Sequence, residues 1–216
     1  MAKEKKNKEV EIVIKPLNFK RAVFTIRGNS LLVQNKFSEK AKQEMITIQE
    51  GGSTSKKGKN REKKDFNAAY KSSQHISPAG WNGIPASAFR SALISACKLC
   101  GYAMTRAKLT IFVVSDGFDK DDKTPLVRIT KGIPKRRDDY VRVGQGKTDI
   151  HARAMFDPGW ESKVTLEWDA DQFTLDDVSN LMVRVGRQVG IQEGRPDSKT
   201  TGGMGWGTFD VLGKAK

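Results

Sequence analysis

Apolar and polar residues alternate along Lys20–Arg27 and along Ser162–Trp168. Strict alternation places one side of a strand in the core and leaves the other in solvent, so both segments are predicted as half-buried strands. The outward side of the first strand then carries Arg21 and Arg27. The side chains expected to point inwards are Ala22, Phe24, Ile26, Val164, Leu166 and Trp168.

Two other segments place apolar residues at helical spacing. The motif Ile84-Pro85-Ala86-Ser87 starts the first helix, which is expected to run to about Cys100 and to stop at Gly101. Thr174 and Asp177 have the spacing of a capping box and start the second helix. The apolar stripe of the first helix consists of Phe89, Leu93, Cys97 and Cys100, and that of the second of Leu175, Val178, Met182, Val185 and Val189.

Four more elements follow from the pattern. Leu109–Val114 is a continuous apolar run, which predicts a strand in the centre of a sheet. Trp206–Leu212 is predicted as the last strand. Near the start of the chain, Ser30–Phe37 is a candidate to extend the strand pairing, and Ser38–Glu50 predicts a short charged helix.

The order strand, helix, strand, strand, helix, strand predicts an α+β fold of the ferredoxin-like βαββαβ type, an antiparallel four-stranded sheet with two helices on one face. Residues 20–212 would form this single domain, behind a basic N-terminal arm at residues 1–19. Two polar segments interrupt it: a lysine-rich loop at 51–64, expected to be disordered, and a long insertion at 116–159. The candidate strands of the insertion are Leu126–Thr130 and Tyr140–Val143.

The net charge is +14 at pH 7, and most of the excess lies near the N-terminus. Residues 1–64 carry 17 Lys and Arg against 7 Asp and Glu, a local excess of +10. Such asymmetry indicates a polyanionic partner, most often a nucleic acid. No apolar run approaches the roughly 20 residues of a membrane-spanning helix, so no membrane partner is expected. Two cysteines three residues apart cannot build a disulfide framework, which favours a cytoplasmic protein.

The segment VGIQEGRPDSKTTGGMGWGTFDV, residues 189–211, combines glycines with basic side chains between the second helix and the last strand. Glycine adopts backbone angles closed to other residues and lets a partner approach the main chain closely. The loop is therefore either a tight structural turn or a cradle for a phosphate-bearing chain. Arg195 and Lys199 in the same loop favour the cradle.

The helix start IPASAFRSALISAC, residues 84–97, and this glycine loop resemble the RAMP superfamily of RNA-binding proteins in CRISPR systems. The resemblance is closest to the subunit that repeats along the crRNA as the backbone of effector complexes. The glycine-rich loop of that family stands where Gly202–Gly207 stands here. The residues that match the family's helix-opening turn are Ile84, Pro85, Ser87, Arg90 and Ala92. The chain also looks like small proteins of tailed phages.

A bare sheet with a basic rim suits single-stranded nucleic acid, because bases can stack on the sheet while cations follow the phosphates. For Trp206, and for Trp81 before the first helix, stacking on a base and filling the end of the core are equal alternatives. The expected binding residues are Arg21, Arg27, Lys56, Lys57, Arg90, Lys98, Lys135, Arg136, Arg137, Arg195, Lys199, Gly202, Gly203, Gly205 and Trp206.

No metal or other cofactor is expected. Cys97 and Cys100 lie late in an apolar helical stripe, which favours inert packing over redox or zinc chemistry. An acidic stretch after the central strand lacks the glycine and the closing glutamate of a calcium loop and is predicted as a solvated turn. Its members are Asp116, Asp119, Asp121 and Asp122.

The primary hypothesis is a non-catalytic protein that binds single-stranded RNA or single-stranded DNA and polymerises side by side along the strand as a helical filament, with other effector-complex subunits as further partners. The resemblance also implies an alternative, a metal-independent endoribonuclease of RAMP type, because such relatives cut RNA with a general acid–base histidine and His75 lies before the first helix. Type III backbone subunits cut with a loop aspartate, for which Asp138-Asp139 is the candidate. A third hypothesis is a phage-encoded interaction protein that mimics a backbone subunit and binds a host complex.

Overall fold

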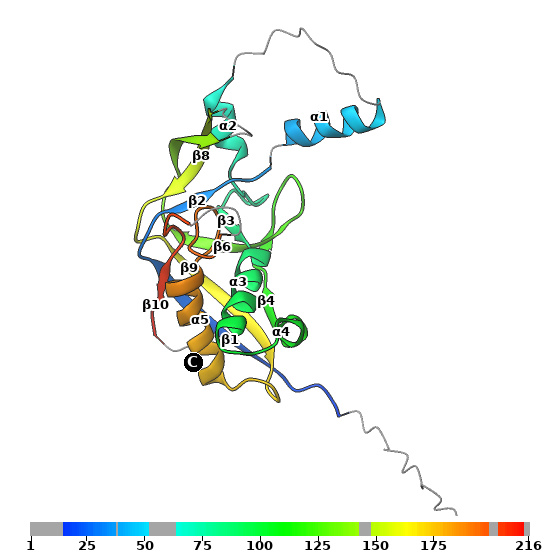
Figure 1. Cartoon of the computed structure of the whole chain (residues 1–216), viewed down its shortest axis with the longest axis vertical. Helices are drawn as coiled ribbons and strands as arrows, with labels where there is room; N and C mark the ends of the chain where they lie inside the picture. The colour runs from blue at the N-terminus through cyan, green and yellow to red at the C-terminus, as the bar shows by residue number, and fades with distance from the viewer. Residues whose placement is uncertain (1–14, 38, 52–63, 143–147, 199–202, 214–216) are drawn as a thin grey trace, which may run out of the picture.

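The computed structural model describes residues 15–37, 39–51, 64–142, 148–198 and 203–213 of the chain. Most of the basic arm and of the lysine-rich loop therefore lies outside the described residues. Four of the predicted binding residues also lie outside them, namely Lys56, Lys57, Lys199 and Gly202. Within the described part, the structure is a mixed α+β fold with antiparallel strand pairing (Figure 1).

The centre of the fold is an antiparallel sheet in the order β10-β1-β9-β4. Its two long strands, β1 (Phe19–Gly28) and β9 (Glu161–Asp169), pair along nine residues. The short strand β10 (Phe209–Val211) pairs with the other edge of β1, and β4 (Ile111–Val114) pairs with β9. The alternation of β1 and β9 is confirmed, because every side chain predicted to point inwards is buried.

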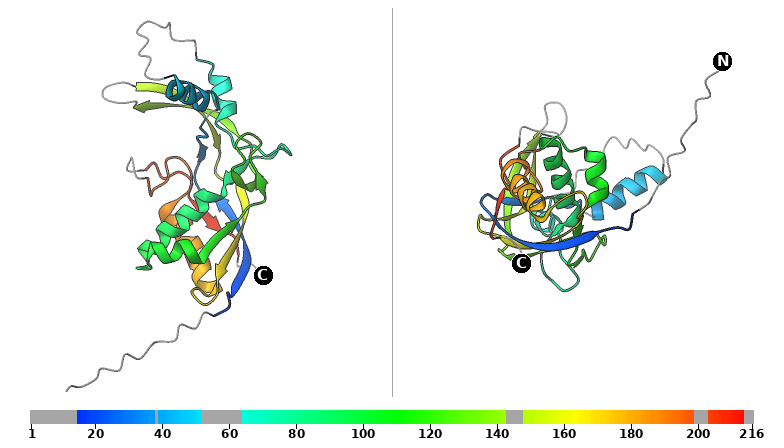
Figure 2. Two further views of the ribbon diagram at one scale, coloured as in Figure 1. Left: turned by 90° about the vertical axis from the view of Figure 1, so that its right-hand side faces the viewer. Right: turned by 90° about the horizontal axis from the view of Figure 1, so that it is seen from below.

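Two helices, α3 (Ala86–Leu99) and α5 (Leu175–Arg184), lie on the same side of this sheet (Figure 2). The predicted capping box of α5 is confirmed, with Thr174 and Asp177 exchanging both hydrogen bonds. A single π-helical turn, η1 (Val185–Val189), continues α5 towards β10. Gly186 in this turn allows that contact, because a Cβ there would lie 2.2 Å from the Phe209 carbonyl oxygen.

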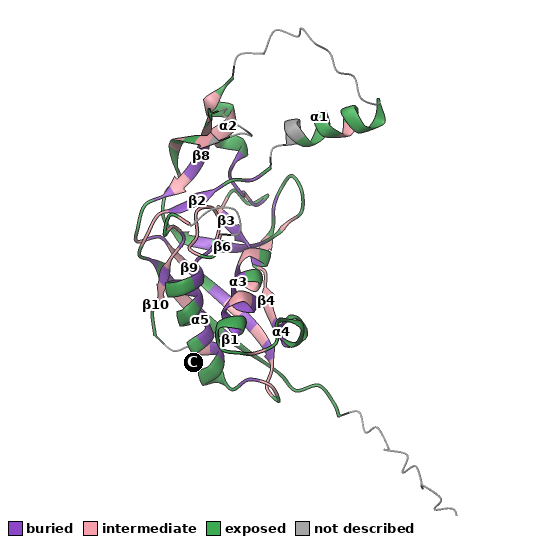
Figure 3. Ribbon diagram, viewed as in Figure 1, coloured by how far each residue is buried: buried purple, intermediate pink, exposed green. Residues whose placement is uncertain are grey.

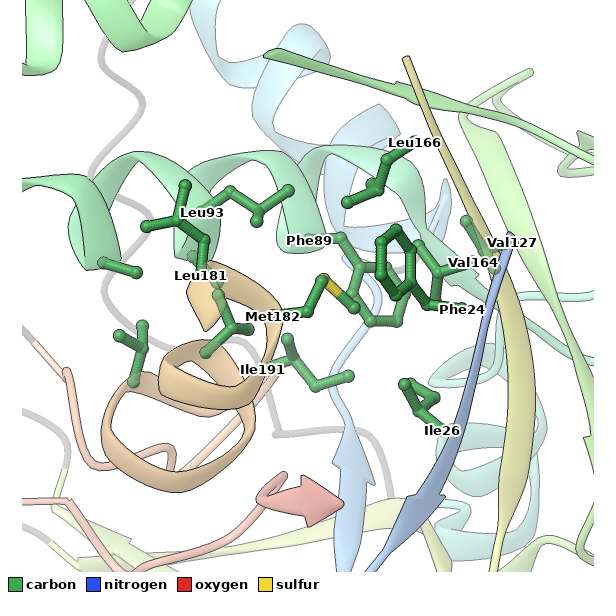
Figure 4. Packing of buried hydrophobic residues seen from close by; sticks show 14 of the residues in the cluster. Phe24, Ile26, Phe89, Leu93, Val127, Val164, Leu166, Leu181, Met182 and Ile191 are labelled. Atoms are coloured by element: carbon green, nitrogen blue, oxygen red, sulfur yellow. The ribbon is translucent and has the colours of Figure 1, made fainter. Parts of the chain in front are cut away.

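The apolar core fills the space between the helices and the sheet (Figures 3 and 4). Figure 4 shows Phe24 of β1 and Phe89 of α3 close together, with Met182 of α5 beside them, and all three are fully buried. Burial of one such side chain stabilises the fold by about 1.5–3 kcal/mol. The core therefore fixes how the sheet and both helices are placed, and with them the loops that join them.

The segment predicted as an insertion is folded, and part of it extends the main sheet. Strand β6 (Pro125–Lys131) confirms the candidate strand at Leu126–Thr130. It pairs with β9 on the edge shared with β4, and also with β3 (Gly83–Pro85) and β5 (Gly117–Phe118). Its apolar side chains Leu126, Val127 and Ile129 are buried.

A second sheet of three strands stands beyond the main one, in the order β2-β8-β7. It consists of β2 (Leu32–Gln34), β8 (Thr148–Phe156) and β7 (Lys135–Arg142). Helix α2 (Phe66–Ser72) packs against β8. The candidate strand at Tyr140–Val143 thus starts earlier than predicted, and Lys135, Arg136 and Arg137 lie on a strand.

Helix α1 (Glu39–Glu50) confirms the short charged helix and projects to one side in Figure 1. Its apolar side chains Met45 and Ile48 are 51% and 59% exposed. A helix of this length is marginal in water without a packing partner. None of the helices in the described ranges is both long and apolar enough to cross a membrane.

The predictions for two strands were partly wrong. Leu109 and Thr110 end a short helix, α4 (Met104–Thr110), and β4 pairs with β9 alone among the described strands, so it lies at an edge and not in the centre of the sheet. Trp206 precedes β10, which starts at Phe209 because three glycine-dependent turns come first. The candidate segment Ser30–Phe37 contains β2, which extends the strand pairing in the second sheet, where it pairs with β8.

Candidate nucleic-acid interface

The side of the main sheet that faces away from the helices carries Arg21 and Arg27, as predicted. Each arginine is opposed across the strand pair by a glutamate. Arg21 Nε lies 2.7 Å from Glu167 Oε1, and Arg27 Nε lies 2.9 Å from Glu161 Oε1. The hydrogen bond from Arg27 lowers the pKa of Glu161. Both arginines predicted on the open face of the sheet are therefore paired within the protein.

An aromatic pair on this same face was not predicted. The rings of Phe19 on β1 and Phe112 on β4 lie 5.8 Å apart, and the guanidinium of Arg90 lies 5.2 Å from the centre of the Phe112 ring. Phe19 lies two residues before Arg21, so the alternation in the sequence could have placed it on this face. Phe112 belongs to a continuous apolar run, whose pattern does not tell one face from the other.

The two predicted binding residues of α3 have different surroundings. Arg90 donates from Nη2 to the Lys108 carbonyl oxygen at 2.6 Å, which ties it to α4. Lys98 is exposed in the last turn of the helix.

The three basic residues of β7 point to alternate faces of the second sheet. Arg136 lies on the side of α2, where it pairs with Asp138 and donates to Asn67 Oδ1 at 2.8 Å. Arg137 lies on the opposite side. Its Nε donates to Asp139 Oδ1 at 2.7 Å, and its guanidinium stands 4.7 Å from the centre of the Trp206 ring. Arg137 and Trp206 were both predicted as binding residues, and the fold brings them into contact across about 70 residues of sequence.

The glycine loop is a series of tight turns held by its own backbone. Gly203, Gly205 and Gly207 all have positive φ angles, and a Cβ at Gly207 would lie 1.8 Å from the Ile191 carbonyl oxygen. The amides of Met204 and Trp206 both donate to the Gly194 carbonyl oxygen. The glycines are thus required by the turn itself, which is the structural alternative that the sequence left open.

Trp206 does not fill the end of the core, which was one of its two predicted roles. The indole is half-buried, lies outside the apolar core, and packs against the backbone of Gly194 and the guanidinium of Arg137. Arg195 donates to the Gln192 carbonyl oxygen at 3.2 Å and so stays within its own loop. Trp81 is also half-buried, with Arg128 over its ring and two glycines packed against it.

Arg153 on β8 is the residue that sequence reasoning missed. It stands directly opposite Arg137 in the strand register, on the same face, and is only 7% exposed. The part of the sheet that carries Arg137, Asp139 and Arg153 is called the arginine face below. No pattern marked Arg153, because it lies in a segment without clear alternation.

Compensation of charge on the arginine face is incomplete. Arg153 Nη1 lies 3.8 Å from Glu193 Oε1, beyond hydrogen-bond distance. Among the described residues, Arg153 Nε and Asp139 Oδ2 are both buried with no hydrogen-bond partner. The face thus holds buried polar atoms that no described residue satisfies.

A second group of buried charges, the Lys36 cluster, lies where β2, α2 and the β5–β6 loop meet. Lys36 Nζ lies 2.6 Å from Asp119 Oδ1 and 2.7 Å from Asp121 Oδ2, and His75 Nδ1 lies 3.2 Å from Asp119 Oδ2. The prediction of a solvated turn for the acidic stretch was therefore wrong at Asp119, which is fully buried. Its partners come from distant parts of the chain, so no local pattern marked it.

Pairing outweighs burial for the charges of the Lys36 cluster. Burial alone would lower the pKa of Lys36, but the hydrogen bonds to Asp119 and Asp121 raise it overall. Burial would likewise raise the pKa of Asp119, whereas Lys36 and the Asp121 amide lower it overall. Burial lowers the pKa of His75 in spite of its bond to Asp119, so the imidazole is neutral near pH 7.

This surrounding bears on the nuclease alternatives. His75 is buried, and its Nδ1 faces the Asp119 carboxylate, which also forms an ion pair with Lys36. The ring is therefore poorly placed to exchange protons with RNA. Asp138 and Asp139 lie on β7, not on a loop, and each is paired with the arginine two residues before it.

The two cysteines differ in their surroundings. Burial raises the pKa of Cys97 to about 11, which keeps this thiol protonated at neutral pH. Cys100 is exposed at the end of α3 and does not share the apolar stripe, contrary to the prediction. In the ranges that the structure describes, no three His, Cys, Asp or Glu side chains are grouped so that they could hold a metal ion.

Comparison of the sequence with models of known protein families gives no match, and comparison with curated proteins gives none either. What supports a function for this chain is therefore the arrangement of its own residues.

Proposed function

We propose that this protein is a non-catalytic binder of single-stranded nucleic acid, RNA or DNA, and that it assembles side by side along the strand. The observation that carries this proposal is the contact between Arg137 of β7 and Trp206 of the glycine loop. An aromatic ring beside guanidinium groups is the combination on which bases stack while phosphates are neutralised. The sequence predicted both of them as binding residues.

The ferredoxin-like plan of RAMP-type proteins is part of this proposal. The strand order β10-β1-β9-β4, with α3 and α5 on one side, is the arrangement that a βαββαβ chain of this plan gives. The glycine loop then occupies the connection between the second core helix and the last core strand, as the resemblance requires. The free thiols at Cys97 and Cys100 agree with a cytoplasmic location.

The distribution of charge favours the arginine face over the open face of the main sheet. Arg21 and Arg27 are neutralised by Glu167 and Glu161, so a phosphate would have to compete with existing ion pairs. On the arginine face, Asp139 is hydrogen-bonded to Arg137, whereas the carboxylate nearest to Arg153, that of Glu193, stands at 3.8 Å. We therefore place the path of the strand along β7, β8 and the glycine loop.

Lateral assembly has separate support in α1. This helix exposes Met45 and Ile48 and is too short to be stable alone. A neighbouring copy of the chain on the same strand would cover these side chains. Contacts of that kind add cooperativity to binding along a single strand.

Binding is tested by fluorescence anisotropy with labelled single-stranded RNA and DNA over a range of salt concentrations. We expect the logarithm of the association constant to fall linearly with the logarithm of salt, by about 0.7 for each phosphate contact. Arg137→Gln is expected to weaken binding and to reduce that slope by about one contact. Affinity that does not change with salt would contradict the proposal.

The matched control is Arg21→Gln, which removes the same charge from the open face of the main sheet. It is expected to change affinity by less than about twofold, because Glu167 already neutralises Arg21. If Arg21→Gln weakened binding as much as Arg137→Gln, the strand would run along the open face instead.

Assembly is tested by light scattering on complexes with oligonucleotides of increasing length. The mass of the complex is expected to rise in steps of one 24.0 kDa protomer. The double substitution Met45→Lys, Ile48→Lys is expected to abolish the steps while single-protomer binding to a short oligonucleotide remains. Steps that persist in this variant would exclude α1 from the contact between protomers.

A further inference from the structure

The arginine face places two guanidinium groups directly opposite each other on neighbouring strands. Arg137 and Arg153 are register partners of β7 and β8. Like charges in such positions repel and destabilise a sheet unless something neutralises them. Arg137 has Asp139 at 2.7 Å as a close partner, so the charge left over is that of Arg153.

Burial makes the position of Arg153 more costly. The side chain is 9% exposed, its closest carboxylate oxygen stands at 3.8 Å, and its Nε has no partner in the described residues. A buried guanidinium needs both charge compensation and hydrogen bonds, because water no longer supplies them. Within the described residues, Glu193 compensates the charge of Arg153 from 3.8 Å, and Arg153 Nε has no hydrogen-bond partner.

The carboxylate that stands before Arg153 belongs to a strained loop. The Glu193 amide donates to the Val33 carbonyl oxygen at 3.2 Å, which fixes its backbone to β2. The residue before it, Gln192, has a φ of 64°, a left-handed conformation that residues other than glycine rarely adopt. Strain of this kind concentrates at functional sites, where the surrounding structure maintains it.

The side chain of Glu193 is partly exposed to solvent. It is 41% exposed, so its carboxylate can turn towards solvent while its backbone stays on β2. The Glu193 carboxylate therefore stands where another anion could bind, without forming a hydrogen bond to Arg153. Arg153 would then become accessible to a competing anion.

We propose that Arg153 is a binding site for one phosphodiester group of the nucleic-acid strand, which displaces the Glu193 carboxylate. The proposal rests on the proposed function for the source of the phosphate, but the site itself requires only an anion with two oxygens. Those oxygens accept from Nε and an Nη of Arg153, in the two-bond geometry that guanidinium groups form with phosphate. The adjacent guanidinium of Arg137 and the ring of Trp206 then serve the next nucleotide.

Inorganic phosphate tests the site without nucleic acid. The melting temperature of the whole chain is measured with increasing phosphate, while chloride keeps the ionic strength constant. We expect phosphate to raise the melting temperature of the wild-type chain and of Arg21→Gln, and not that of Arg153→Gln. Equal stabilisation of all three proteins would overturn the proposal.

Oligonucleotide affinity tests the displacement of Glu193. Arg153→Gln is expected to weaken binding about tenfold and to reduce the salt slope by about 0.7. Glu193→Gln is expected to strengthen binding, by about twofold to threefold, because the competing charge is gone. Weaker binding by Glu193→Gln would show that the carboxylate helps to hold the strand, and would overturn the displacement.

Folding of the variants is checked by circular dichroism. If Arg153→Gln fails to fold, the affinity of Glu193→Gln still tests the proposal, because the Glu193 side chain is 41% exposed. The two proposals can fail separately. A chain that binds no oligonucleotide but is stabilised by phosphate through Arg153 loses the proposed function and keeps this site. A chain whose oligonucleotide binding is unchanged in both variants keeps the proposed function and loses the site.

Discussion

The Lys36 cluster and the arginine face both bury charged side chains, but only the Lys36 cluster compensates them. Lys36 and Asp119 are 3% and 0% exposed, and each lies within hydrogen-bond distance of an opposite charge. Arg153 is buried to a similar extent, with one carboxylate beyond hydrogen-bond distance. The free-energy cost of burying charge is thus offset by ion pairs in the Lys36 cluster and is not fully offset on the arginine face.

This difference separates a structural role from a binding role. A fully paired cluster gains nothing from a ligand, and it joins β2, α2 and the β5–β6 loop. An incompletely paired group is stabilised by whatever anion reaches it. Substitutions in the two regions should therefore have opposite signatures, a loss of stability in the first and a loss of binding in the second.

The largest effect is expected at Asp119. Asp119→Ala leaves the ammonium of Lys36 buried beside the single, more exposed carboxylate of Asp121, which should lower the free energy of unfolding by about 3–5 kcal/mol. Urea denaturation measures it. Asp121→Asn is the control, because this carboxylate is 42% exposed and its loss should cost about 1 kcal/mol or less. Equal losses in both variants would mean that the cluster is not a closed network.

A smaller loss is expected from the glycine loop. Gly207→Ala forces a side chain into a φ of 67° and against the Ile191 carbonyl oxygen, which should cost about 2–3 kcal/mol. Gly205 has a φ of 72° but open space around it, so Gly205→Ala should cost only about 1–2 kcal/mol. Thermal unfolding of both variants compares them. A larger loss of stability in Gly205→Ala would mean that the close contact between Gly207 and Ile191 does not determine the shape of the loop.

A smaller effect is expected from the dependence of stability on pH, which reports on His75 in the Lys36 cluster. The pKa of His75 is lower in the folded chain than its ordinary value of 6.5, so the unfolded chain takes up a proton first. The free energy of unfolding should therefore decrease as the pH falls below about 6.5. Denaturation curves at several pH values measure this slope, and His75→Gln should flatten it. A slope that is unchanged in this variant would assign it to other groups.

The smallest effect is expected on the open face of the main sheet. Arg21→Gln removes an exposed ion pair with Glu167, and such pairs contribute about 0–1 kcal/mol. Neither the melting temperature nor the affinity for an oligonucleotide should change appreciably. A large loss of affinity would move the binding surface from the arginine face to this one.

The elements that could be predicted from the sequence are those with a local signal. The alternation in β1 and β9 and the capping box at Thr174 each depend on neighbours within a few residues, and all three are confirmed. The Lys36 cluster joins residues more than 40 positions apart, so neither its burial nor its pairing left a local pattern. Its aspartate looked like one more acid in a polar turn.

The candidate site was predicted in its composition but not in its arrangement. Arg137 and Trp206 were both chosen for their chemistry, yet their contact depends on how the second sheet stands beside the glycine loop. Arg153 was missed because an arginine in a strand without alternation carries no sign of burial. Lys135, Arg136 and Arg137 were all predicted as binding residues, whereas a strand divides them between two faces of the sheet.

The pairing of β6 with both β9 and β3 has a consequence for how this chain can vary. Because Leu126, Val127 and Ile129 belong to the interior, the region between β4 and β9 cannot be trimmed to leave a minimal four-stranded unit. Related chains of different sizes should therefore keep β6.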